Sequence, residues 1–352
     1  MKTRIGCAVI GYGGMGHWHA QRIAKHDELA WIGAYDIRPE RLADLPGTIG
    51  GQAFGSREAL LADPRVELVV VATPNDVHRE IAVAALQAGK HVICEKPVAM
   101  DSAELEAMIA AAKQAGRLFT VHQNRRWDGD YLRMKHILDA GTLGPVFSIE
   151  SRVHGSRGIP GDWRNQRVHG GGMVLDWGIH ILDQALMMTL PRKVVAVHAR
   201  LTNVTNTDCD DGFRVVLAFD DGLDFLLEVG TSNFISLPRW YMLGENGSAV
   251  IPDWSCKGEI VMVSDWENRD AVPIQAGAGL TKTMAPRTDE TIRKYPLPDV
   301  RADWGECYSN VIAAIRGEAK PLVTHDQQRR LMRLVEAVFD SAERREVVRL
   351  SL

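Results

Sequence analysis

The chain has 352 residues, 45% hydrophobic and 24% charged, with a formal net charge of −4 at pH 7. This composition is typical of a globular protein with a sizeable core, and the length predicts two domains or one domain with a large elaboration. The weak negative charge argues against nucleic acid as a partner, and no apolar run approaches the ~20 residues of a membrane-spanning helix. Met1–Arg4 lead directly into an apolar segment, so we expect no signal peptide. Five scattered cysteines without a C-x-x-C pair predict reduced thiols, a cytoplasmic location and no metal site.

Strands and helices alternate from residue 4 to about residue 122. This pattern predicts an α/β Rossmann domain over residues 1–122, with a doubly wound parallel sheet covered by helices on both faces. The expected strands are Arg4–Ile10, Leu29–Tyr35, Ala53–Phe54, Val66–Ala72, His91–Cys94 and Leu118–Val121, and the expected helices are His17–Lys25, Pro39–Leu45, Ser56–Leu61, His78–Ala88 and Ser102–Ala115.

A glycine-rich turn follows the first expected strand in the order G-x-G-x-x-G. The first glycine permits a tight turn, the second lets the backbone approach a pyrophosphate, and the third lets a helix pack closely on the strand. A helix that opens near Met15 would direct unpaired N–H groups and the positive end of its dipole at a diphosphate. The residues expected to bind a dinucleotide here are Gly11, Tyr12, Gly13, Gly14, Met15 and Gly16.

An acidic residue ends the second expected strand. Asp36 lies 20 residues after Gly16, where a carboxylate accepts hydrogen bonds from an adenosine ribose. The same carboxylate would repel a 2′-phosphate, which predicts NAD as the cofactor. Arg38 can pair with that phosphate, so NADP stays open as a weaker alternative, unless Arg38 is only a solvent-facing charge before Pro39.

Two further segments follow strands of the same sheet. Ligands of such sheets bind beyond the carboxyl ends of the strands. We therefore expect Thr73, Pro74, Asn75 and His78 beside the cofactor, and the alternative for Thr73-Pro74 is an ordinary strand-ending turn. Glu95-Lys96-Pro97 follows the fifth strand, and its lysine lies inside the predicted cleft rather than on a solvated edge.

Beyond residue 122 the pattern changes to α+β. Residues 123–352 predict a second domain with a large, mainly antiparallel open sheet that carries helices on one face. Its C-terminal helices can pack back on the first domain. Helices are expected at Asp130–Ala140, Trp304–Arg316 and His325–Arg344, a long irregular loop at Gln275–Pro298, and strands at Val146–His154, Val194–Val204, Phe213–Phe219, Leu223–Thr231, Arg239–Gly244, Ser248–Ile251 and Glu259–Val263.

A sheet with helices on one face only leaves apolar positions on the other face that need cover. We therefore expect a homodimer or homotetramer formed through this sheet. Apolar residues alternate along three strands, and the face that they occupy stays open at this point: Val195, Val197, Val215, Leu217, Phe225 and Leu227.

A second polar constellation follows three glycines, Gly170–Gly172. Asp176, His180 and Asp183 are spaced i, i+4, i+7, so on a helix they share one face. A buried helix whose polar groups satisfy one another is one alternative, and a pair of metal ligands without an evident third is another. Because imidazole titrates near neutral pH, His180 suits the role of a general base. Lys96 would share the proton or stabilise an alkoxide, and Asp176 would orient the imidazole or pair with the lysine.

With these motifs in order, the chain resembles the Gfo/Idh/MocA family of NAD(P)-dependent oxidoreductases over nearly its whole length. The marks are the glycine turn, Glu95-Lys96-Pro97, and Gly171-Gly172 leading to Asp176 and His180. The resemblance implies that Lys96, Asp176 and His180 surround the nicotinamide and substrate, with the histidine as acid/base and the lysine as its helper. It also implies cofactor contacts for Asn124, Arg125, Trp163 and Arg164.

The family's substrates are mostly sugars and polyols, so the resemblance implies an NAD-dependent sugar or polyol dehydrogenase. Asp176-Trp177-Gly178-Ile179-His180 is more particularly similar to members that oxidise a ring hydroxyl of glucosides or other pyranoses. We expect His154, Trp163 and Arg164 to bind the substrate together with the catalytic residues. Two alternatives from the same family stay open: a non-catalytic NAD-binding, sugar-sensing regulator, and a redox-neutral glycoside cleavage with tightly held NAD.

Overall fold

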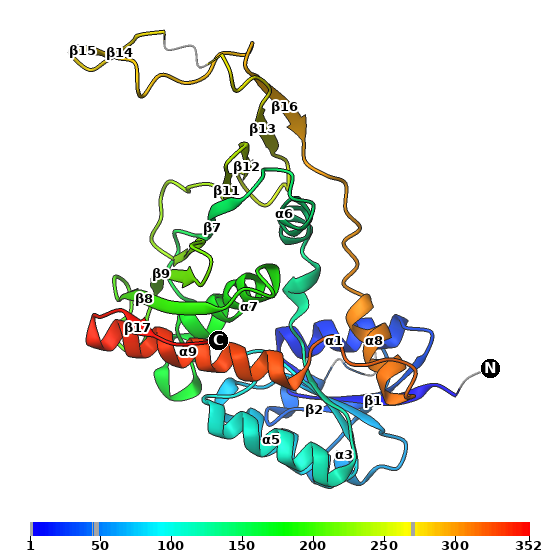
Figure 1. The fold of residues 1–352 in the computed structure, drawn as a ribbon. Helices are drawn as coiled ribbons and strands as arrows, with labels where there is room; N and C mark the ends of the chain where they lie inside the picture. The colour runs from blue at the N-terminus through cyan, green and yellow to red at the C-terminus, as the bar shows by residue number, and fades with distance from the viewer. Residues whose placement is uncertain (1–2, 44, 46–48, 269–271) are drawn as a thin grey trace.

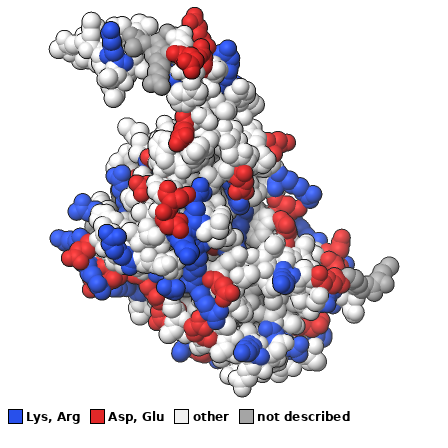
Figure 2. Space-filling view, viewed as in Figure 1, with Lys and Arg blue, Asp and Glu red and all other residues white. Residues whose placement is uncertain are grey.

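The structure is a computed structural model that describes residues 3–43, 45, 49–268 and 272–352. Figure 1 shows two sheets, one in the lower part of the molecule and one above it, with a thin hairpin that projects from the upper sheet. Figure 2 shows acidic and basic side chains interspersed over the face in view. Among the described residues, no helix is long and apolar enough to cross a membrane.

The lower sheet has six parallel strands in the order β3-β2-β1-β4-β5-β6. The chain runs outward from β1 to β3 and then returns to place β4 on the other side of β1, which opens a crevice at the carboxyl ends of these two strands. The prediction of a parallel Rossmann sheet is confirmed. Its elements are β1 (Ile5–Ile10), α1 (Gly14–Lys25), β2 (Leu29–Tyr35), β3 (Gln52–Ala53), α3 (Arg57–Ala62), β4 (Leu68–Val71), α4 (His78–Gln87), β5 (His91–Cys94), α5 (Ser102–Ala115) and β6 (Phe119–Val121).

One expected helix of this half begins differently from the prediction. Residues Pro39–Leu42, the first part of the helix expected at Pro39–Leu45, form a 3₁₀ turn. Residue 44 of that expected helix lies outside the described residues. The four-residue turn is nevertheless useful to the site, because it brings Arg41 beside the end of β2.

The upper sheet has nine strands in the order β16-β13-β12-β11-β7-β10-β9-β8-β17. Its pairs are antiparallel except β7 with β10, so the prediction of a mainly antiparallel second sheet is confirmed. Its elements are α6 (Gly129–Asp139), β7 (Val146–His154), α7 (Ile179–Met188), β8 (Val194–Thr202), β9 (Gly212–Phe219), β10 (Asp224–Gly230), β11 (Trp240–Gly244), β12 (Gly247–Ile251), β13 (Glu259–Val263), β14 (Ile274–Ala276), β15 (Gly279–Thr281), β16 (Ile292–Pro296), α8 (Glu306–Ile315), α9 (His325–Arg344) and β17 (Val348–Arg349).

The expectation of a long irregular loop at Gln275–Pro298 is wrong in part. β14 and β15 pair as a two-stranded hairpin, which is the projecting segment in Figure 1. β16 then joins the large sheet by pairing with β13. Its sequence, Ile292-Arg293-Lys294-Tyr295-Pro296, has no apolar alternation because most of the strand is exposed. An exposed edge strand lacks the pattern by which a half-buried strand is recognised.

The alternating apolar residues of β8, β9 and β10 face the helices. Val197, Val215, Leu217, Phe225 and Leu227 are fully buried, whereas Val195 is half-buried. The five buried residues therefore belong to the internal core, and the opposite face carries other side chains. The homo-oligomer stays a prediction that would use that opposite face.

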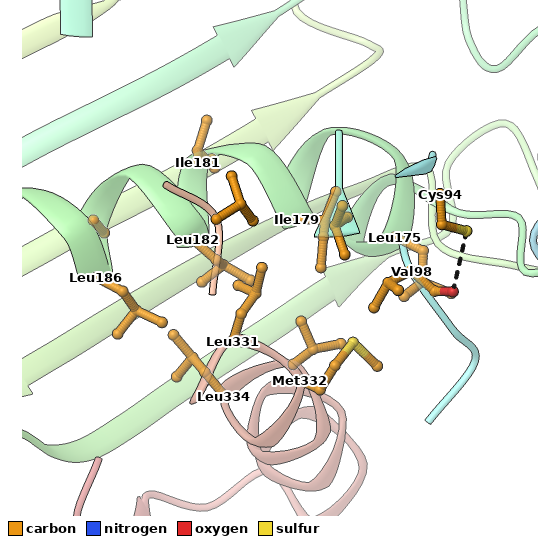
Figure 3. Close-up of a cluster of buried hydrophobic side chains, with 14 of the residues drawn as sticks. Cys94, Val98, Leu175, Ile179, Ile181, Leu182, Leu186, Leu331, Met332 and Leu334 are labelled. Atoms are coloured by element: carbon orange, nitrogen blue, oxygen red, sulfur yellow. Dashed lines mark hydrogen bonds between the residues drawn. The ribbon is translucent and has the colours of Figure 1, made fainter. Parts of the chain in front are cut away.

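Helix α7 is held between the upper sheet and α9. In Figure 3, Leu182 and Leu186 of α7 lie against Leu331 and Leu334 of α9, and all four are buried. Near its start, Leu175 lies beside Cys94 and Val98, which bracket Glu95-Lys96-Pro97. This packing fixes the end of β5 against the segment that carries Asp176 and His180.

Helix α8 packs on the lower sheet although it comes late in the chain. Tyr308, Val311 and Ile312 are buried in the same apolar cluster as residues of β1 and α1, including Cys7 and Ile23. The C-terminal part of the chain therefore contributes to the core beneath the glycine turn.

Candidate active site

The glycine turn between β1 and α1 fits a diphosphate. A Cβ on Gly11, whose φ is +92°, would lie 2.5 Å from the carbonyl oxygen of Ala72, and a Cβ on Gly16 would overlap that of Gly11. Gly14 begins α1 and has open space where a side chain would be. No described side chain caps α1, and its first turn, with half-buried Met15, has no acidic residue. The helix N-terminus therefore keeps free N–H groups for an anion.

Asp36 is buried at the end of β2 and is held by the glycine turn. Its Oδ2 accepts from the backbone N–H of Tyr12 at 2.6 Å, and its Oδ1 from that of Arg38 at 2.8 Å. Arg41 Nη1 lies 3.2 Å from Oδ2, so Arg41 supplies the guanidinium at this position, while the side chain of Arg38 is exposed. Arg41 was not among the predicted site residues, and the exposed side chain of Arg38 fits the alternative of a solvent-facing charge before Pro39.

The segment after β4 connects the two halves of the molecule. Asn75 Nδ2 donates to the carbonyl oxygen of Gly170 at 2.8 Å. The ring nitrogens of His78 lie 2.9 Å and 3.0 Å from the carbonyl oxygens of Pro97 and Thr73. Half-buried Pro74 leads into this turn, and the buried Oγ1 of Thr73 has no partner among the described residues. Asn75 and His78 thus brace the loops, and Thr73 keeps a hydroxyl available for a ligand.

Glu95 lies at the centre of a buried hydrogen-bonded chain that sequence reading missed. Its Oε1 accepts from His19 Nε2 and His122 Nδ1, both at 2.8 Å, and its Oε2 accepts from the backbone N–H of Lys96 at 3.1 Å. The Tyr308 hydroxyl contacts His19 Nδ1. Burial opposes ionisation of Glu95, yet His122 and His19 hold the pKa of its carboxyl well below the usual range.

His19, Glu95 and His122 are also the set of described residues that could offer ligands to a metal ion, since their donor atoms lie within 4.8 Å of one another. The 2.8 Å contacts have the length of hydrogen bonds and join Glu95 Oε1 to one nitrogen of each histidine, while the buried Nε2 of His122 has no partner among the described residues. We therefore interpret the cluster as a hydrogen-bonded group that fixes the Glu95 carboxylate next to Lys96.

Replacing Tyr308 by phenylalanine should lower the free energy of unfolding by about 1–3 kcal/mol, because the buried Nδ1 of His19 then loses its donor. Urea unfolding measures this change, and Tyr295→Phe, at an exposed residue of β16, is the matched control. Equal stability of Tyr308→Phe and wild type would contradict the proposed chain of hydrogen bonds.

Lys96 and Asp176 form an ion pair between the two halves of the chain. Lys96 Nζ donates to Asp176 Oδ1 and to the Asp176 carbonyl oxygen, each at 3.0 Å. Burial raises the pKa of the Asp176 carboxyl, but Lys96, Arg164 and Arg125 outweigh it and lower that pKa. Asp176 is therefore ionised and holds the lysine at a fixed point.

His180 is buried close to this pair. Burial, together with the positive charges of Lys96 and Arg125, lowers the pKa of His180 well below its usual range. Its Nδ1 has no hydrogen-bond partner in the part of the chain that the structure describes. A neutral imidazole with a free nitrogen can accept a proton, which is what a general base requires.

The helix that carries Asp176 and His180 is irregular at its start. Val174–Gly178 form a π-helix that continues into α7, so the spacing i, i+4, i+7 does not lie on one α-helical face. Asp183 points elsewhere and forms a two-pronged ion pair with Arg126, at 2.6 Å and 2.7 Å. Asp210 Oδ2 accepts from the N–H of Val174 at 2.8 Å and holds the start of the π-helix. Such π segments occur often at functional sites.

A cavity of about 680 Å³ lies beside Asp176. Lys96, His180, Asn124 and Trp163 are outside its lining. Its lining residues are Arg125, Val153, His154, Gly155, Ser156, Arg157, Gly158, Pro160, Arg164, Met173, Asp176, Trp177, Val229, Gly230, Thr231 and Trp254.

The four remaining residues of the predicted site have different surroundings. His154 lines the cavity, but Nε2 is bonded to Glu228 Oε1 at 2.8 Å and Nδ1 to the N–H of Leu237 at 3.2 Å, so both ring nitrogens are used. Arg164 lies 4.7 Å from the ring of Trp163 and reaches toward Asp176, with 3.9 Å between Nε and Oδ2. Asn124 begins the 3₁₀ turn Asn124–Trp127 after β6.

Two tryptophans of the cavity wall were not predicted as site residues. The guanidinium carbon of Arg125 lies 4.1 Å from the ring of Trp177 and 5.8 Å from that of Trp254. Trp177 is part of the Asp176–His180 motif and could have been suspected from it. Trp254 lies in an irregular turn after β12, where no local pattern indicates a site.

Comparisons with known proteins identify the family of the chain. A sequence model described as "Oxidoreductase family, NAD-binding Rossmann fold" matches residues 5–123, and one described as "GFO/IDH/MocA C-terminal domain" matches residues 131–250. The uncharacterized oxidoreductase YdgJ of Escherichia coli (strain K12) is 31% identical over 98% of each chain. The scyllo-inositol 2-dehydrogenase (NADP(+)) IolW of Bacillus subtilis (strain 168) is 28% identical over 98% of this chain and 96% of that protein.

A solved structure of an NAD-binding protein from Listeria innocua is 42% identical, has a TM-score of 0.93, and covers 99% of this chain and 100% of that chain. Both domain matches fall in the expected order, and the relatives extend over nearly the whole length. The chain therefore belongs to the Gfo/Idh/MocA family of NAD-binding oxidoreductases.

Proposed function

We propose that this protein is an NAD-dependent dehydrogenase that oxidises a ring or chain hydroxyl of a sugar, polyol or glycoside. The name of the IolW relative, an inositol dehydrogenase with NADP(+), supports a polyol hydroxyl as the group that is oxidised. The observation that carries the proposal is the neutral, buried His180 beside the Lys96–Asp176 ion pair. A regulator that only binds the dinucleotide has no use for a base and a fixed ammonium at the same point.

The chain's own groups supply proton transfer and orientation. When NAD is bound, its nicotinamide would supply the acceptor for the hydride of the carbinol carbon. His180 takes the hydroxyl proton, because its imidazole is neutral and has an unpaired nitrogen. The ammonium of Lys96, fixed by Asp176, stabilises the alkoxide that develops on the same oxygen. Thr73 and the N-terminus of α1 would bind other parts of the cofactor.

Asp36 supports NAD as the preferred cofactor. Its buried carboxylate would lie against the adenosine ribose and repel a 2′-phosphate, whereas Arg41 beside it would attract one. We expect the wild type to prefer NAD, and Asp36→Asn to raise the kcat/KM ratio of NADP to NAD more than about tenfold, since like charges in contact cost several kcal/mol.

Adding Arg41→Ala to Asp36→Asn should reverse most of that gain, because the guanidinium that attracts the phosphate is then absent. Steady-state kinetics with both cofactors measure these ratios. A wild-type enzyme that prefers NADP would contradict the assignment of NAD as the cofactor.

A panel of polyols, free sugars and glycosides, assayed with the purified protein for net NADH formation, tests the proposed function. Continuous NADH formation with at least one compound is the expected result. Two results would contradict it in different ways. Conversion of a glycoside without net NADH would indicate the redox-neutral branch, and tight NAD binding without any conversion would indicate a regulator.

A further inference from the structure

The cavity has an aromatic wall made by two tryptophans from different elements. Trp177 follows Asp176 directly in the π-helix, and Trp254 comes from the turn after β12. Their ring centroids are 5.7 Å apart and their planes are inclined by 47°. One end of the cavity is therefore next to the proposed reacting group, and the aromatic wall extends from that end toward Trp254.

Trp254 is exposed at the cavity surface but braced from the protein interior. Its exposed fraction is 48%. The guanidinium carbon of Arg239 lies 4.8 Å from its ring, and Arg239 is buried and paired with buried Asp130 at 3.1 Å. Removing an ion pair such as Arg239–Asp130 from water costs free energy. The half-exposed indole of Trp254 contributes little to the hydrophobic core, so core packing does not explain its position. The arrangement suits a rigid apolar platform for a ligand.

The lining of the cavity separates it from the dinucleotide crevice. It includes Asp176 and Arg125 but neither Lys96 nor any residue of the glycine turn. Its volume of about 680 Å³ lies in the middle of the range of about 300–1,000 Å³ that is usual for small-molecule sites. A substrate whose hydroxyl reaches Lys96 and His180 therefore has space for a further group over Trp177 and Trp254.

We propose that the substrate carries a second ring, joined through a glycosidic oxygen, and that Trp254 determines specificity by packing against it. This inference rests on the proposed function. The second ring can be an aryl group or a sugar, because both offer an apolar face to an indole. The guanidinium of Arg125 near both indoles adds a preference for electron-rich rings. Free polyols and monosaccharides fill only the reacting end.

Matched pairs of compounds test the platform without relying on turnover. Methyl and phenyl β-glycosides of glucose, galactose and mannose, with cellobiose and lactose as two-sugar probes, are titrated by calorimetry into the protein loaded with NADH. For the preferred sugar, the phenyl glycoside or the disaccharide should bind about tenfold more tightly than the methyl glycoside. Comparison of the phenyl glycosides with the disaccharides shows whether the second ring is an aryl group or a sugar.

In Trp254→Ala the ratio of the affinity for the two-ring compound to that for the methyl glycoside should fall to near one. The methyl glycoside itself should bind as in wild type. Trp254→Phe retains a ring and should keep most of the advantage, which separates stacking from a folding defect. Trp266→Ala is the matched control, because Trp266 is also 48% exposed and stacked on an arginine, Arg287, but lies outside the cavity.

The inference is overturned if one-ring compounds bind at least as tightly as two-ring compounds in wild type, or if Trp254→Ala weakens both classes equally. Absence of NADH formation with every compound, together with a tenfold second-ring advantage, would refute the proposed dehydrogenase and support the platform. NADH formation without that advantage would refute the platform alone.

Discussion

Replacing His180 by alanine should lower kcat for alcohol oxidation by about 10²–10⁴-fold, the usual contribution of a general base. His180 is neutral at working pH because burial and the charges of Lys96 and Arg125 lower its pKa. NAD affinity should change little, since the groups that fit the diphosphate and ribose lie on α1 and at the end of β2. Steady-state kinetics on the best substrate of the panel, with a direct NAD titration, measure both effects.

His198→Ala is the control for this variant, because His198 is an exposed histidine of β8. Since the alanine leaves a buried space, urea unfolding should accompany the kinetics to show that the protein is folded at the assay temperature. A folded His180→Ala enzyme with near-normal kcat would exclude the imidazole as the base.

Lys96→Met should reduce kcat at least as strongly, since it removes the donor proposed for the developing alkoxide and takes from Asp176 its hydrogen-bonded partner. It should also move the acid limb of the pH profile of kcat/KM. Burial lowers the pKa of His180 most, and the Lys96 charge adds to that effect. Without the lysine this pKa rises, so the base becomes protonated at a higher pH and activity is lost earlier on acidification.

The pH profiles of wild type and Lys96→Met, recorded from about pH 5 to 9, measure the shift, and Lys25→Met at an exposed position of α1 serves as the control. An acid limb that stays in place, or moves to lower pH, would show that the lysine charge does not act on the titrating base.

The parts of the fold that depend on local patterns could be predicted from the sequence. β1 is six buried residues followed by a glycine turn, and α5 has both its Asp101 cap and its Gly116 stop, so the first sheet was predictable strand by strand. β16 was missed because its side chains are mostly exposed, and Pro39–Leu45 was misjudged because a short 3₁₀ turn shares helix-like composition. The π-helix could not be predicted, because a single turn with i→i+5 hydrogen bonds leaves no periodic pattern in the sequence.

In the candidate active site, too, some residues could be predicted from local motifs and others could not. Lys96, Asp176 and His180 lie in compact motifs next to a strand end and glycines, and their proximity could be expected from the resemblance of these motifs to the family. Tyr308 reaches His19 across 289 positions of sequence, a contact that no local pattern predicts. Arg41 and Trp254 likewise enter the site through turns whose path depends on tertiary packing.

Transfer of deuterium from substrate to cofactor would show directly that this protein moves a hydride to NAD. The best substrate of the panel, deuterated at the carbinol carbon, is incubated with NAD and the wild-type protein, and the free nicotinamide cofactor is analysed by mass spectrometry. We expect one deuterium in each NADH released, in step with the oxidised product, and strongly reduced transfer with His180→Ala. Released NADH without deuterium, or label that returns entirely to the product with no net NADH, would contradict this expectation.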